Sequence, residues 1–135
     1  MRTLILIATC LILSACADRI TAPIQPEALN APNTRQIFVV TNRQRNAEGY
    51  LATSRNDELT FLDTTVSIPP SHTSGEAPTF KANPDPEKHF VIAKETPIAT
   101  LPDLARKVSA SLAGNPRRNR EVTVFVHGFY NTYQD

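Results

Sequence analysis

The sequence predicts an α/β fold, in which a mostly parallel sheet has its strands joined by one crossover helix. A β-branched apolar run at 36–41 and the run VTVFV at 122–126 are typical of strands. Between them, apolar residues recur at helical spacing over 101–112. VTVFV is apolar on both faces, as expected of a central strand that helices cover. We therefore expect a right-handed strand, helix, strand unit.

The first fifteen residues predict a signal peptide. Arg2 precedes an apolar run at 4–13, which is well short of the roughly 20 residues that a bilayer-spanning helix needs. The sequence LSAC, ending at Cys16, resembles the lipobox of bacterial lipoproteins, whose cysteine is acylated. By this resemblance Cys16 is a lipid anchor in the bacterial cell envelope. Ala17 after it favours the outer over the inner membrane. The alternative is ordinary secretion with Cys16 unmodified.

Residues 16–35 predict a flexible tether, because three prolines lie there among small and polar residues. Residues 36–135 are expected to form the folded domain. Its predicted strands are Gln36–Thr41, Thr65–Ile68, His89–Thr96 and 122–126. The polar segment 43–62 predicts a loop with one or two weak edge strands, and 71–88 a long loop.

One amphipathic helix is predicted after the third strand. Thr100 can cap it, with Asp103 three positions later and Pro102 in its first turn. Its apolar face carries Leu101, Leu104, Val108 and Leu112. Gly114 and Pro116 close the helix.

The composition argues against several classes of protein. Lys and Arg number 14 against 13 Asp and Glu, so nothing indicates a nucleic-acid partner. Cys10 lies in the signal peptide and Cys16 would carry lipid, which leaves no disulfide pair. His72, His89 and His127 are far apart without metal-ligand spacing, so we expect no metal and no other cofactor. Ser71 and His72 are adjacent, which favours a loop over a catalytic pair.

A candidate catalytic element follows the last predicted strand. Gly128 has no Cβ and can turn sharply, so that the backbone N–H of Phe129 faces a substrate. Backbone amides in such a loop stabilise the negative oxygen that develops during acyl transfer. His127 is expected to shape this oxyanion loop. We do not expect it to act as the general base.

Four segments in this order carry a family resemblance: IFVVTNRQR, VSIPPSHTSGE, PDPEKHFVIAKE and VFVHGFYNTYQD. Together they resemble a bacterial family of α/β-hydrolase-like proteins, often lipoproteins, catalogued as a domain of unknown function. The resemblance covers about Gln36 to the end. It implies a serine hydrolase acting on a small ester or amide substrate, with an α/β-hydrolase-like sheet.

The nucleophile elbow G-x-S-x-G of such enzymes is absent from this sequence. Its four glycines are Gly49, Gly75, Gly114 and Gly128, and no two lie four positions apart. The sequence therefore predicts the N-terminal part of a lipid-anchored hydrolase-like protein, truncated before the elbow and inactive by itself. The alternative is a noncatalytic envelope lipoprotein that binds a partner, for example through an exposed edge strand.

Overall fold

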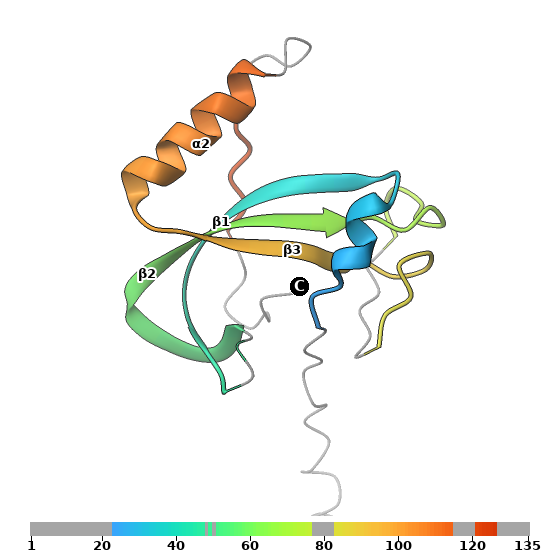
Figure 1. Ribbon diagram of the computed structural model, residues 1–135, viewed down its shortest axis with the longest axis horizontal. Helices are drawn as coiled ribbons and strands as arrows, with labels where there is room; N and C mark the ends of the chain where they lie inside the picture. The colour runs from blue at the N-terminus through green and yellow to red at the C-terminus, as the bar shows by residue number, and fades with distance from the viewer. Residues whose placement is uncertain (1–22, 48, 50, 77–82, 115–120, 127–135) are drawn as a thin grey trace, which may run out of the picture.

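The computed structural model describes residues 23–47, 49, 51–76, 83–114 and 121–126. In this part the chain forms one three-stranded sheet with a short helix at one end and a longer helix beside it (Figure 1). The elements in chain order are η1 (Pro26–Asn30), β1 (Thr34–Arg45), β2 (Leu51–Ser67), β3 (Val91–Ile98) and α2 (Leu101–Ala113).

The predicted mostly parallel α/β-hydrolase-like sheet is wrong. The strand order is β1-β2-β3, and both neighbouring pairs are antiparallel. β1 and β2 are consecutive and form a hairpin, which only antiparallel strands can do through a short connection. Gly49 lies in that connection with φ of 85°, a left-handed conformation that favours glycine. The described fold is therefore an antiparallel sheet with one helix.

The prediction of a central strand at 122–126 is also wrong. Residues 121–126 belong to no helix or strand, and all six are exposed. A strand exists only where its backbone N–H and C=O groups pair with a neighbour. The β-branched residues of VTVFV favour extended backbone, but no strand of the described sheet pairs with this segment.

β2 is the long central strand, and its first half bends away from the rest of the sheet (Figure 1). Pairing with β1 is regular from Thr34↔Ser67 to Thr41↔Thr60, and then becomes irregular. The next pair is Arg43↔Arg55, so residues 56–59 lie opposite the single Asn42. Extra residues in one strand of an antiparallel pair bend it and increase its twist.

The segment 43–62, predicted as a loop with one or two weak edge strands, instead contains the end of β1 and most of the central strand β2. Despite its polar composition, this part of β2 pairs with β1 on both sides of the irregular stretch at 56–59. An ion pair between Arg45 and Glu95 of β3 ties the bent end back to the main sheet. The side chain of Glu95 is 6% exposed and that of Arg45 is 38% exposed, so the carboxylate is buried while the guanidinium still meets solvent.

The core lies where β2 and β3 meet η1. Leu62 of β2 is fully buried, and Ala28 of η1 packs with Val91 and Ala93 of β3. Burying a side chain such as leucine stabilises a fold by about 1.5–3 kcal/mol. η1 lies in the segment predicted as a tether, and the backbone N–H of Gln25 before it donates to Ile92 of β3 at 3.0 Å.

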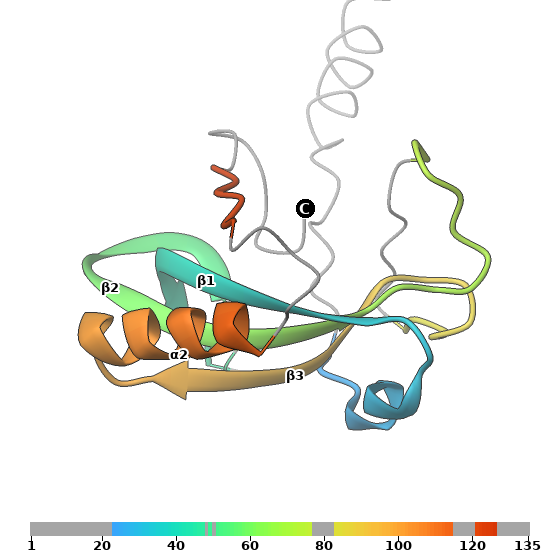
Figure 2. The ribbon, with the colours of Figure 1, turned by 90° about the horizontal axis from the view of Figure 1, so that it is seen from above.

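The predicted amphipathic helix is confirmed as α2. Thr100 is its N-cap, and its side-chain hydroxyl accepts from the backbone N–H of Asp103 at 3.3 Å. Leu104 is buried, and Lys107 donates to Asp63 of β2 at 3.1 Å. In Figure 1 α2 rises from the end of β3, and in Figure 2, seen from above, it lies in front of the strands.

Three of the four predicted strands coincide with strands of the sheet. Gln36–Thr41 lies within β1, and His89–Thr96 overlaps β3 from Val91 onward. Thr65–Ile68 coincides with the last residues of β2 and runs one residue past its end. In the described ranges no helix combines the length and the apolar character needed to cross a bilayer.

Candidate interaction surface

The predicted site residues all lie outside the described residues. They are His127, Gly128 and Phe129 of the proposed oxyanion loop and Cys16, the proposed lipid anchor. The oxyanion loop and the anchor therefore stay predictions. The candidate site that the structure does place consists of the segment 121–126, the edges of the sheet and two loops at one end of it.

The segment 121–126 presents three valines to solvent. Val122, Val124 and Val126 are 57%, 79% and 82% exposed. Single exposed apolar residues are ordinary on a protein surface, but a run of alternating valines is not. The run VTVFV is apolar at every position except Thr123, which is the pattern of a strand covered on both faces. The segment therefore has the composition of a strand that would gain burial by pairing with another strand.

The two edge strands of the sheet differ in how open they are. β3 carries Pro97, which has no backbone N–H for a ladder, and its Ile92 carbonyl already accepts from Gln25. β1 has no proline over its twelve residues and pairs only with β2 among the described strands. Ile37 and Val40 on β1 are both about half exposed. Of the two edges, β1 is the one suited to accept another strand.

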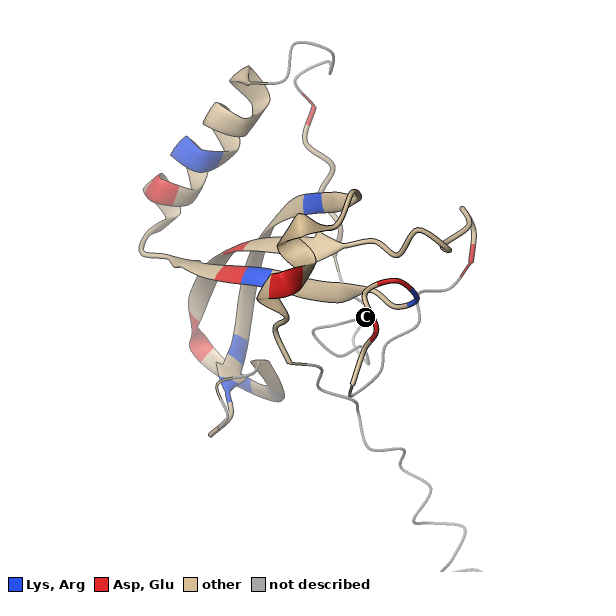
Figure 3. Cartoon of the chain, turned by 45° about the vertical axis from the view of Figure 1, so that its right-hand side comes forward, with Lys and Arg blue, Asp and Glu red and all other residues tan. Residues whose placement is uncertain are grey.

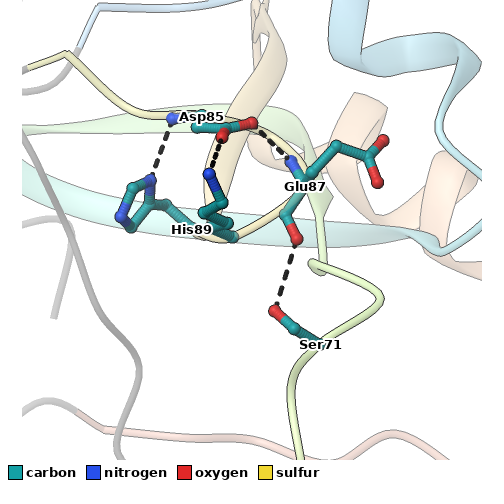
Figure 4. A network of polar contacts seen from close by, with 5 residues as sticks. Ser71, Asp85, Glu87 and His89 are labelled. Carbon is teal, nitrogen blue, oxygen red and sulfur yellow. Dashed lines mark hydrogen bonds and ion pairs between the residues drawn. The ribbon is translucent and has the colours of Figure 1, made fainter.

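Two loops at one end of the sheet are joined by polar contacts (Figure 4). The hydroxyl of Ser71 donates to the carbonyl of Glu87 at 3.3 Å. The Asp85 backbone N–H donates to Nδ1 of His89 at 2.9 Å, and the Asp85 carboxylate accepts from the Glu87 N–H at 3.1 Å and pairs with Lys88 at 3.1 Å. The second loop therefore folds around Asp85.

This cluster was missed from the sequence, although a signal is present. Asp85 is followed by Pro86, and an aspartate that accepts from the N–H two residues later forms a typical turn. The backbone carbonyl of Asp85 also accepts from the N–H groups of Lys88 and His89, at 2.9 and 2.8 Å. Asp-Pro-Glu-Lys-His thus encodes a tight turn within the segment 71–88, for which the sequence predicts a long loop.

The chemistry open to the two loops is limited by their existing hydrogen bonds. A catalytic serine needs a base within hydrogen-bond reach of its hydroxyl. Ser71 instead donates to a backbone carbonyl, and Nδ1 of His89 accepts from a backbone amide. His72 lies edge-on to Phe90, with ring centroids 4.8 Å apart. These contacts hold the two loops together and form no nucleophile and base pair.

Charges are interspersed over the described surface. Figure 3 shows both acidic and basic residues on the strands and on α2, and Arg43 and Arg55 lie opposite each other at the bent end of the β1–β2 hairpin. In the described ranges, no group of three or more His, Cys, Asp and Glu side chains is arranged to hold a metal ion. This surface offers little to a polyanion, and a partner would be recognised mainly through apolar and backbone contacts.

Two carboxyl groups have shifted pKa values. For Asp63, burial alone would raise the pKa, but hydrogen bonds from Gln36 and Lys107 and the charges of Lys107 and Lys94 lower it overall. For Asp85, the hydrogen bond from Lys88 is the largest cause of a lowered pKa, and the Glu87 N–H adds to it. Both shifts favour the carboxylate in the folded chain, where Asp63 ties β2 to α2 and Asp85 shapes its turn.

No protein-family model, no curated protein and no solved structure matches this chain. The class that the described residues define is therefore a structural one: a small antiparallel sheet with one flanking helix, which exposes an apolar segment after that helix.

Proposed function

We propose that this chain is a lipid-anchored, noncatalytic module of the bacterial envelope that binds a partner protein by strand pairing. The residues 122–126 form the donated strand, and the partner supplies an open sheet edge. Strand addition of this kind gains affinity from backbone hydrogen bonds and specificity from alternate side chains. The lipid at Cys16 would hold the module at the membrane surface.

The observation that carries the proposal is the exposure of Val122, Val124 and Val126. When the segment pairs with the edge strand of the partner, its three valines would join the apolar face of the partner's sheet. Its backbone N–H and C=O groups would form hydrogen bonds with that edge strand. The interspersed surface charges support a partner of the same mixed character rather than a nucleic acid. The Ser71 loop supports a noncatalytic role, because its serine donates to a carbonyl instead of a base.

Photocrosslinking tests the proposal in the full chain expressed in bacteria. A benzophenone amino acid is placed at Val124, and the crosslinked partner is identified by mass spectrometry down to the attached peptide. We expect one dominant adduct, whose attached peptide lies on an open edge strand of the partner. Val124→Asp, tested with the crosslinker at Val122, should weaken this adduct at least tenfold, because a charge would then face the apolar side of the partner's sheet.

Leu59 provides the matched control, because it is an apolar residue of β2 with a similar exposure of 59%. The same amino acid at Leu59 should not give the Val124 adduct. Equal adducts from both positions, or an adduct that survives Val124→Asp, would contradict strand pairing by 122–126. The serine-hydrolase hypothesis remains a prediction with its own readout: fluorophosphonate labelling of a serine in the full chain would overturn the noncatalytic proposal.

A further inference from the structure

One contact of the turn around Asp85 requires a histidine in one protonation state. Nδ1 of His89 accepts the Asp85 backbone N–H at 2.9 Å, so this nitrogen carries no proton. An imidazole that gains a second proton has donors at both nitrogens and can no longer accept. The contact is therefore available only to neutral His89. Histidine is the side chain that changes charge most readily between pH 5 and 8.

The turn that contains this contact is linked to its surroundings on both sides. Glu87 within the turn accepts from Ser71 of the other loop at 3.3 Å. Pro84, directly before Asp85, accepts from the side-chain amide of Gln25 at 3.1 Å. Gln25 precedes η1, whose Ala28 packs in the core. Loosening the turn at His89 would therefore reach both the Ser71 loop and the approach to η1.

We propose that residues 83–90 and the Ser71 loop form a pH-sensitive clasp, in which protonation of His89 removes the acceptor for Asp85 N–H and loosens the contacts to Ser71 and Gln25. The change requires no ligand. It would make the mobility of this end of the sheet depend on the acidity around the protein.

The other charged groups of the clasp affect how its contacts change when His89 gains a proton. The carboxylate of Asp85 is close enough to interact with a charged His89, but it already binds Lys88 and the Glu87 N–H. Protonated His89 would compete with Lys88 for that carboxylate, which changes the turn further. Among the described residues, the other titratable groups on the elements that meet here are Glu87, His72 and Glu76 of the two loops, Glu27 of η1, and Lys94 and Glu95 of β3.

Amide hydrogen exchange of the full chain, measured by NMR in detergent, tests the clasp. After correction for intrinsic exchange rates, we expect the protection of the Asp85 amide to fall about threefold to tenfold between pH 8 and pH 5, as for the loss of one hydrogen bond. His89→Asn should abolish this pH dependence, because the side-chain oxygen of asparagine accepts near the position of Nδ1 and does not titrate.

His72→Asn is the matched control. His72 lies in the same loop cluster but contacts the ring of Phe90, so the variant should keep the wild-type pH dependence. Unchanged protection in the wild type, or a fall that persists in His89→Asn, would overturn the proposal. The nitrogen chemical shifts of His89 in the wild type give a second readout if a variant does not fold. The pH midpoint of the change in these shifts must coincide with the pH midpoint of the change in Asp85 amide protection. Separate midpoints would contradict the clasp.

Discussion

β3 and the segment 121–126 have similar composition but different environments. Both contain β-branched apolar residues, and both were predicted as strands. In β3, Val91 and Ala93 are almost fully buried because β2 pairs with one edge and η1 packs against this strand. In 121–126 the valines are exposed, since no strand of the described sheet lies beside them. The comparison teaches that the neighbouring strand or helix, more than strand propensity, determines whether such residues are buried.

The largest expected effect comes from comparing a buried side chain of the sheet with an exposed side chain of 121–126. Leu62→Ala removes a fully buried side chain from the central strand and should lower the free energy of unfolding by about 2–5 kcal/mol. Val124→Ala should change it by less than about 0.5 kcal/mol. Urea unfolding followed by circular dichroism measures both. A loss of several kcal/mol in Val124→Ala would show that the segment is part of the folded core, and the comparison would fail.

Asp63→Asn tests how firmly α2 is held on the sheet. The carboxylate accepts from Gln36 and from Lys107 of α2, so the substitution should cost about 1 kcal/mol at pH 7. The folded pKa of Asp63 is lower than its ordinary value of 3.8. Its stabilisation is therefore complete above that value and is lost as the pH falls through the folded pKa.

The decisive measurement is how the difference in unfolding free energy between wild type and Asp63→Asn depends on pH. Urea unfolding of wild type and Asp63→Asn should differ least at the lowest pH at which both fold. Asp57→Asn, at an exposed position of the same strand, is the control and should show no such convergence. A difference that stays constant from pH 7 down to pH 3 would assign the loss to packing and not to the charge of Asp63.

Thr100→Ala should have a smaller effect, confined to the start of α2. The hydroxyl of Thr100 satisfies the N–H of Asp103, and losing such a cap costs about 1 kcal/mol or somewhat less. Helix content by circular dichroism and exchange of the Asp103 amide should both report the loss. Thr100→Ser keeps the hydroxyl and should restore most of the cap. Equal losses in the two variants would exclude capping as the cause.

The helix and parts of all three strands could be predicted from local sequence, and the signals are most complete for α2 and β1. Thr100, Pro102 and the apolar face of α2 specify a helix independently of its neighbours. The run at 36–41 specifies β1 in the same way. The first half of β2 could not be predicted, because its residues are largely exposed on a bent ribbon and show little apolar alternation.

The candidate site was predicted less well, for a different reason. The contact between His89 and Asp85 depends on a turn closed by backbone groups, and no periodic sequence pattern predicts such a contact. Ser71 and Glu87 are sixteen residues apart and meet only through the fold. Strand direction was misjudged because a run such as VTVFV is equally compatible with parallel, antiparallel or absent pairing. His127, Gly128 and Phe129 remain expectations from the resemblance alone.

The difference between the two edges of the sheet limits assembly. Fibrils of stacked strands require each sheet to add a neighbour on both sides. Here Pro97 and the bond from Gln25 obstruct one side, while β1 is available on the other. Edge-to-edge association should therefore stop after one addition. At high local concentration, copies of this protein would therefore form at most edge-to-edge pairs through β1 and would not grow into long fibrils.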